Sequence, residues 1–189
     1  GHFTACDDAP ASMIVAFKPQ TGRFQALGSG ASNGVNASVH ALAVSGSDLY
    51  VAGSFTQAGD QPANHIARWN GSSWSSLGTG LVPGANSYIN ALAVSGGDLY
   101  VGGRFTQFGG QPANNIARWN GGTWSPLGTA TVNGVARDGG LASVNSLAIS
   151  GSDLYVGGAF TEAGGQPANR IARWDGTRWS SVGTGAANG

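Results

Sequence analysis

The stretch DLYVAGSFT at residues 48–56 decides the fold of this 189-residue chain, because the chain contains it three times. It returns as DLYVGGRFT at 98–106 and as DLYVGGAFT at 153–161, so equivalent positions lie 50 and then 55 residues apart. The motif QPAN-x-IARW follows each copy, beginning at Gln61, Gln111 and Gln166, and a second tryptophan closes each unit. A fixed period of this length is typical of repeat architectures.

A fourth, degraded copy precedes these three. With an offset of 52 residues, Ile14 aligns with Ile66, and Phe17 stands where the complete copy carries Trp69. This copy begins partway through the unit, so we count about three and a half repeats. The expected boundaries are a partial unit at 1–36, a unit at 37–86, a unit with a longer connection at 87–141 and a unit at 142–189.

Within one copy the apolar residues follow the period of a strand, not that of a helix. The runs at 41–44, 49–51 and 66–69 are short and bounded by turn residues, and a fourth run surrounds Trp74. Asn70-Gly71 predicts a tight hairpin connection, because both residues accept positive φ. The sequence therefore predicts an all-β fold with four short antiparallel strands per repeat. Two architectures fit, a β-propeller of stacked four-stranded blades and a β-trefoil.

The sequence RWNGGTWSPLG at 118–128, preceded by LYVGG at 99–103, resembles a kelch-type blade. The first copy, AFKPQTGRF at 16–24, resembles the kelch stretch of an aromatic residue, Asp-Pro, a polar pair and Trp. More specifically, residues 3–185 are similar to Gly- and Trp-rich tandem repeats of secreted bacterial proteins with kelch or galactose-oxidase-like propellers. The resemblance favours the propeller, and about three and a half blades would not close a ring alone. We expect a second copy of the chain, another chain or a longer propeller to complete it, because an unclosed end exposes a strand edge and an apolar face.

Composition excludes several classes of protein and partner. Nine basic residues are cancelled by nine acidic ones, so no charged stripe that would track nucleic acid is expected. No apolar run approaches the roughly 18 residues of a membrane span, so none is expected. The single cysteine, Cys6, excludes a disulfide within the chain. Charged residues make up only 10%, and Gly, Ser, Thr and Asn dominate the polar set, which favours a secreted or cell-surface protein.

We expect no catalytic site, metal or cofactor. The three histidines, His2, His40 and His65, form no metal-type pair along the sequence. Neither a nucleophile elbow nor a phosphate-binding loop is present. The galactose-oxidase resemblance implies copper held by tyrosine and histidine with a cysteine–tyrosine crosslink, and the sequence offers no matching set.

The copies serve as their own comparison set, and residues common to all of them are expected to be structural. The repeated tyrosines and tryptophans are expected to pack between blades with their polar tips hydrogen-bonded. The repeated arginines, Arg68, Arg118 and Arg173, are expected to lie over an aromatic ring or to pair with Asp48, Asp98 and Asp153. The repeated asparagines, Asn64, Asn114 and Asn169, form either Asx-type turns or one identical polar pocket per blade.

Positions that vary between copies are the candidates for specific recognition. Ser54, Arg104 and Ala159 share one position; Ala58, Phe108 and Ala163 share another; His65, Asn115 and Arg170 share a third. A ligand recognised by a unique constellation would contact Arg104, Phe108 and the long connection that carries Arg137. The candidate ligand-binding residues are therefore Arg104, Phe108, Arg137, Asn64, Asn114 and Asn169.

These features predict a non-catalytic extracellular binding or structural propeller module that mediates protein–protein association or assembly at a cell surface. Its expected partner is a second copy or another chain that completes the propeller. Two alternatives remain open, a carbohydrate-binding lectin with one equivalent site per blade and a fragment of a larger secreted enzyme. Glycans are therefore possible ligands at this point.

Overall fold

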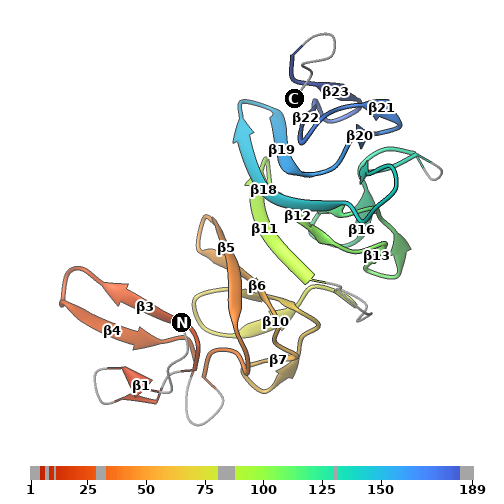
Figure 1. Cartoon of the computed structure of the whole chain (residues 1–189). Coiled ribbons are helices and arrows are strands. Elements are labelled where there is room, and N and C mark those ends of the chain that lie inside the picture. Colours follow the sequence, from red (N-terminus) through yellow and green to blue (C-terminus); the bar gives the residue numbers. More distant parts are fainter. Residues whose placement is uncertain are drawn as a thin grey trace. The chain divides into compact units, whose positions relative to one another are not determined.

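The computed structural model describes residues 5–6, 9–10, 12–28, 33–80, 88–129 and 132–183, which form strands and turns without a helix (Figure 1). The chain divides into two compact units, Gly1–Gly80 and Leu81–Gly189. Each unit is described by itself.

Three four-stranded antiparallel sheets, called here the second, third and fourth blades, correspond to the three complete repeats. In each blade the strands lie side by side in chain order. The second blade consists of β5 (Val39–Ser45), β6 (Asp48–Gly53), β9 (Ile66–Trp69) and β10 (Trp74–Ser76). The third consists of β11 (Tyr88–Ser95), β12 (Asp98–Arg104), β15 (Ile116–Trp119) and β16 (Trp124–Pro126). The fourth consists of β18 (Ser143–Ser150), β19 (Asp153–Ala159), β22 (Ile171–Trp174) and β23 (Trp179–Ser181).

A small hairpin extends from each blade between its second and third strands. These hairpins are β7 (Gln57–Ala58) with β8 (Gln61–Pro62), β13 (Gln107–Phe108) with β14 (Gln111–Pro112), and β20 (Glu162–Ala163) with β21 (Gln166–Pro167). In the fourth blade the connecting strand β17 (Val135–Ala136) pairs with β20 and makes a three-stranded sheet. The connection between the third and fourth blades is thereby tied to the blade that follows it.

The first, partial blade contains β1 (Ala5–Cys6), β2 (Ala9–Pro10), β3 (Val15–Lys18) and β4 (Arg23–Ala26). Strands β3 and β4 take the places of the third and fourth strands of a complete blade. Phe17 and Phe24 face each other across them with ring centroids 5.2 Å apart and planes at 54°. Trp69 and Trp74 in the second blade lie 5.4 Å apart at 51°. The alignment of Phe17 with Trp69 is confirmed.

A β-bulge at the same place in every complete blade explains the second glycine of the repeated Gly-Gly or Ala-Gly pair. The register between the first and second strands shifts between Val39 and Ala41, between Ile89 and Ala91, and between Val144 and Ser146. A Cβ added at Gly53, Gly103 or Gly158 would overlap the backbone carbonyl oxygen of residue 38, 88 or 143. The bulged strand approaches so closely that only glycine fits opposite it.

In each unit an apolar core cluster joins neighbouring blades. In Leu81–Gly189, Tyr100 and Ile116 of the third blade share a cluster with Val156 and Trp174 of the fourth. In Gly1–Gly80, Ile14 and Leu27 of the first blade share a cluster with Val51 and Trp74 of the second.

The last tryptophan of a blade is hydrogen-bonded to the blade before it. The indole N–H of Trp179 donates to the carbonyl oxygen of Leu127 at 3.0 Å. That of Trp74 donates to the carbonyl oxygen of Leu27 at 2.7 Å. For these two tryptophans the expected packing between blades with a satisfied polar tip is confirmed.

The repeated arginines form the expected ion pairs with the repeated aspartates. The Nε–Oδ2 distances are 2.8 Å for Arg68–Asp48, 2.9 Å for Arg118–Asp98 and 3.0 Å for Arg173–Asp153. The pairs are partly exposed, and pairs of this kind contribute about 0–1 kcal/mol each. Burial raises the pKa of Tyr50 and Tyr100 beside them, and the neighbouring aspartates raise it further, while the arginines lower it.

The Asn-Gly loops connect the last two strands of a blade, but without the two positive φ angles that the sequence predicts for a tight turn. Gly71 takes positive φ at 97°, but Asn70 does not and instead accepts hydrogen bonds. Asn70 Oδ1 receives the N–H groups of Ser72 at 2.9 Å and Ser73 at 2.8 Å. The asparagine therefore acts as an Asx-type acceptor, and only the glycine supplies the unusual backbone angle.

The fourth blade carries Asp175 at this position. We expect this difference to make the stability of the fourth blade depend on pH in the acidic range. Asp175 Oδ1 accepts the N–H groups of Arg178 at 2.7 Å and Thr177 at 2.8 Å. These bonds, with that from the Thr177 hydroxyl, lower the pKa of Asp175 from 3.8 to about 2. Because the pKa of Asp175 is lower in the folded than in the unfolded chain, its ionised carboxylate stabilises the fold at pH values above the unfolded-state pKa. This stabilisation is lost as the pH falls from about 4 through about 2.

Asp175→Asn tests this expectation, because Asn70 and Asn120 show that an asparagine suits the loop. The urea midpoint of the variant is expected to fall less than that of the parent chain between about pH 4 and pH 2. Parallel pH profiles for the two proteins would contradict the prediction.

Candidate functional site

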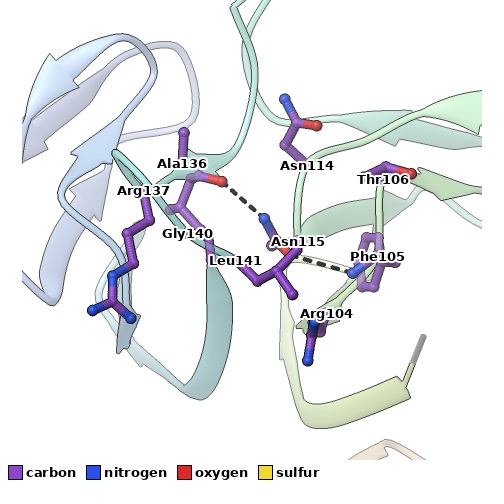
Figure 2. Close-up of a pocket in the computed structure, with 11 residues that line it drawn as sticks. Arg104, Phe105, Thr106, Asn114, Asn115, Ala136, Arg137, Gly140 and Leu141 are labelled. Atoms are coloured by element: carbon purple, nitrogen blue, oxygen red, sulfur yellow. Dashed lines mark hydrogen bonds between the residues drawn. The ribbon is translucent and has the colours of Figure 1, made fainter. Parts of the chain in front are cut away.

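A pocket of about 370 Å³ opens where the third blade meets the long connection to the fourth (Figure 2). Arg104 ends β12, and Thr106 follows it. Arg137 follows β17, and Leu141 lies just before β18. Two candidate residues, Arg104 at a varying position and Arg137 on the long connection, therefore line one pocket, together with the repeated Asn114.

The wall of this pocket is fastened by Asn115, which has left-handed backbone at φ 66°. The residue is 8% exposed, and both its amide oxygen and its amide nitrogen form hydrogen bonds. Asn115 Oδ1 accepts the N–H of Phe105 at 3.2 Å, and its Nδ2 donates to the carbonyl oxygen of Val135 at 2.9 Å (Figure 2). The residue joins the end of the second strand to the connection that crosses the pocket.

Two of the repeated asparagines, Asn64 and Asn114, hold the connections that leave their blades. Asn114 donates its N–H to Asn133 Oδ1 at 2.9 Å and its Nδ2 to the Asn133 carbonyl oxygen at 3.2 Å. Asn64, in the unit Gly1–Gly80, donates its Nδ2 to the carbonyl oxygen of Thr79 at 3.0 Å. Neither the Asx-type turn nor the polar ligand pocket anticipated this role, because the partners are 15 and 19 residues away in sequence.

A second pocket of about 300 Å³ occupies the corresponding place in the fourth blade. Asn169 and Arg170 line it at the positions of Asn114 and Asn115, and Ala159 lines it at the position of Arg104. Arg137 lines both pockets, so the two adjoin. Four of the six candidate residues, Arg104, Asn114, Arg137 and Asn169, thus gather around one pair of pockets.

The pair of pockets carries positive charge without a matching acid. Among the residues that the structure describes, ion pairs involve only the three repeated arginines, so Arg104, Arg137 and Arg170 have none. Asp138 and Glu162 are the acidic residues next to the pocket linings in sequence, and neither makes an ion pair with a guanidinium group. Arginines without an acidic partner at a concave site attract anionic groups.

Arg170 lines the second pocket, although it was named from the sequence only as a varying position and not among the six candidate ligand-binding residues. It holds left-handed backbone at φ 65°, a conformation that costs an arginine more than an asparagine. His65 and Asn115 hold the same conformation at the equivalent positions, with φ of 64° and 66°, so this backbone is a feature of the repeat. The signal available in the sequence was its place beside Asn169 at a position that varies between copies.

The structure corrects the expectation for Phe108, which does not reach either pocket. Its side chain is completely buried. The ring centroid lies 4.9 Å from that of Phe105 and 4.4 Å from that of Trp124. Phe108 fills the space beneath the β13–β14 hairpin, so a ligand cannot contact it without opening the core.

The described residues contain no group of three or more histidine, cysteine, aspartate or glutamate side chains placed to hold a metal ion. Within the same residues no helix is long and apolar enough to cross a bilayer.

Comparison with known families agrees with the blade geometry. Residues 48–72, 97–121 and 153–174 match the model of a family described as "Domain of unknown function (DUF5122) beta-propeller". The repeats are β-propeller blades. Each matched segment starts at or just before the second strand of a blade and extends through the third, and the match favours the propeller over the trefoil. It supports a propeller repeat without specifying the kelch or galactose-oxidase type. No curated protein matches the chain.

Proposed function

We propose that this propeller chain is a non-catalytic binding module that associates with a partner molecule at a cell surface or outside the cell. The observation that carries the proposal is the gathering of Arg104, Arg137 and Arg170 around two adjoining pockets, without an acidic partner among the described residues. The low content of charged residues, 10%, supports the extracellular location.

The chemistry of the two pockets favours an anionic group on a partly apolar partner. A guanidinium group binds a carboxylate through two parallel hydrogen bonds. Leu141, 66% exposed, and Ala142 supply apolar surface beside the arginines. An acidic segment of another protein, with aspartate or glutamate next to apolar residues, fits this combination.

Removing the arginines tests the proposal. A fluorescent oligoglutamate peptide is titrated with the parent chain and with the Arg104→Ala/Arg137→Ala variant, and binding is followed by anisotropy. We expect the affinity to fall at least about tenfold, because a hydrogen bond to a charged group contributes about 1.5–3 kcal/mol.

Arg23→Ala is the matched control, because Arg23 is an exposed arginine on β4, outside the pocket linings. Its affinity for the peptide is expected to equal that of the parent chain. Equal affinities for the parent chain and the double variant would contradict the proposal.

The lectin alternative with one identical site per blade receives no support from the pocket linings. Equivalent positions carry Ser54, Arg104 and Ala159, so the sites differ chemically. None of the six tryptophans is exposed, and neither arginine pocket has a tryptophan in its lining, so those pockets offer no indole face for a sugar ring to stack on.

A further inference from the structure

The second pocket, in the fourth blade, is polar and offers a ligand little apolar surface. Gly158 and Ala159 of β19 are the smallest residues of its lining, and Ala159 stands where the third blade carries Arg104. Phe160 is the one large apolar residue of the lining, and it is only 1% exposed. The exposed Leu141 lines the first pocket and not the second. The two pockets therefore suit ligands of different chemistry.

The second pocket has two free guanidinium groups, those of Arg137 and Arg170. Neither forms an ion pair or a side-chain hydrogen bond with the residues that the structure describes. The backbone of Arg170 is held in place, because its N–H donates to the carbonyl oxygen of Phe160 at 3.0 Å and its carbonyl oxygen accepts the N–H of Gly158 at 2.8 Å. Arg137 lies across the first pocket from Arg104 (Figure 2), and it also lines the second. Two uncompensated positive charges thus adjoin one small pocket.

Asn145 offers the pocket its amide nitrogen, because other groups engage its amide oxygen. The carbonyl oxygen of Val144 accepts Asn90 Nδ2 at 3.0 Å, which fixes the orientation of the Asn90 amide. The same nitrogen lies 3.4 Å from Asn145 Oδ1, and the Ser143 hydroxyl donates to that oxygen at 3.1 Å. An NH₂ group can only donate, so the Asn145 oxygen must face it. The register of β18 shifts at Asn145, and bulges commonly redirect a side chain towards a site.

The Thr161 hydroxyl also has a hydrogen to donate. Its Oγ1 accepts the N–H of Asp138 at 3.1 Å. Because a backbone N–H can only donate, the hydroxyl hydrogen remains available for another acceptor. The side chains of Asp138 and Glu162, the acidic residues nearby in sequence, do not line the pocket.

Four hydrogen-bond donors from separate segments therefore line the second pocket. They are the guanidinium groups of Arg137 and Arg170, the Asn145 amide nitrogen and the Thr161 hydroxyl. Asn169, the remaining polar residue of the lining, has an interaction of its own within the protein. A ligand that satisfies this set must accept several hydrogen bonds and carry negative charge.

We propose that the second pocket binds a tetrahedral oxyanion, the phosphate or sulfate group of a monoester. A phosphate monoester presents three acceptor oxygens and a charge of about −1.5 to −2 at pH 7, which matches two guanidinium groups and two neutral donors. A carboxylate presents two oxygens and one charge. Guanidinium groups bind phosphate through two parallel hydrogen bonds each. This inference deepens the proposed function and rests on it, because it takes Arg137 and Arg170 to be binding residues.

Methyl phosphate is the probe, since its methyl group adds almost no apolar surface. It is titrated into the whole ¹⁵N-labelled chain at constant ionic strength, because salt screens exposed charges, and the backbone amide signals are followed by NMR. We expect saturable shifts at Asn145, Thr161 and Arg170. Acetate, which offers two oxygens and one charge, is expected to bind at least about tenfold more weakly.

Arg170→Asn removes one positive charge without straining the backbone. It copies Asn115, which holds the same left-handed conformation at φ 66° in the third blade. We expect the affinity for methyl phosphate to fall at least about tenfold, because a charge-assisted hydrogen bond is lost. Arg178→Thr is the matched control, since it copies Thr123 of the third blade, removes an equal charge outside the pocket lining and keeps the N–H that donates to Asp175. Its affinity is expected to equal that of the parent chain.

A pair of substitutions at Thr161 tests the hydroxyl separately from the charge. Thr161→Val keeps the shape of the side chain and is expected to weaken methyl phosphate binding about threefold or more. Thr161→Ser keeps the hydroxyl and is expected to bind like the parent chain. A loss caused by a distorted blade would not be restored by serine.

The outcomes separate this inference from the proposed function. Absence of saturable shifts, equal affinities for acetate and methyl phosphate, or an unchanged affinity in Arg170→Asn overturns it. If oligoglutamate still binds the parent chain, only this inference falls. Binding of methyl phosphate without binding of oligoglutamate overturns the acidic segment as the partner and leaves the oxyanion site. Titration with methyl sulfate distinguishes the two sources, because tighter binding of methyl phosphate identifies a phosphorylated ligand and tighter binding of methyl sulfate a sulfated one.

Discussion

Gly103→Ala is expected to destabilise the unit Leu81–Gly189 by about 3 kcal/mol or more, because backbone at a bulge has no room to yield. Gly103 lies opposite the bulge in β11, and an added Cβ would overlap the carbonyl oxygen of Tyr88. Relief requires β11 to move, and β11 packs against β18 of the next blade (Figure 1). The free energy of unfolding in urea, followed by tryptophan fluorescence, measures the loss.

Gly122→Ala is the matched control for this substitution. The nearest atom to its added Cβ is the Asn120 Oδ1, at 3.8 Å, and its φ is not positive. We expect a change within about 0.5 kcal/mol. A similar small change for Gly103→Ala would show that the bulge does not depend on glycine.

Phe108→Ala is expected to cost about 3–5 kcal/mol, the range for removing a fully buried phenylalanine ring. The ring touches Phe105 and Trp124, and these neighbours are themselves held in the core, so a cavity remains. The measurement is again urea unfolding of the whole chain. We also expect the tryptophan emission of the folded state to change, because Trp124 loses its closest aromatic contact.

The other blades sharpen this prediction, because Ala58 and Ala163 occupy the same repeat position as Phe108 and are buried there. Alanine is therefore compatible with the hairpin backbone, and the loss measures packing rather than a change of fold. Leu141→Ala, at a residue 66% exposed, is the control and is expected to change stability by less than about 0.5 kcal/mol. A loss below about 1 kcal/mol for Phe108→Ala would show that the third blade collapses around the smaller side chain.

Local patterns in the repeat were sufficient to predict its strands. The short apolar runs with a period of two predicted antiparallel strands. For Arg68 the sequence left two alternatives, stacking on an aromatic ring or pairing with Asp48, and the pairing is confirmed at 2.8 Å. The strands and the ion pairs depend only on residues of adjacent strands, and those residues recur in each of the three copies. The role of Asn114 was not predictable in this way, because its partner Asn133 lies on a connection whose path the repeat does not specify.

Phe108 is a second residue whose location the sequence did not predict. Variation between Ala58, Phe108 and Ala163 suggested recognition, but variation alone does not distinguish a surface from a core that is filled differently in each blade. Arg104 and Arg137 lie 33 positions apart in sequence, and only the course of the long connection brings them to one pocket.

The amino-acid sequence by itself determined the period and the four-stranded blade, because the residues that set backbone pairing and alternating burial recur in every copy. Tertiary structure alone decided which varying side chains meet at the pockets. The reason is physical: pairing within a sheet follows local pattern, whereas the place of a loop depends on the packing of one blade against another.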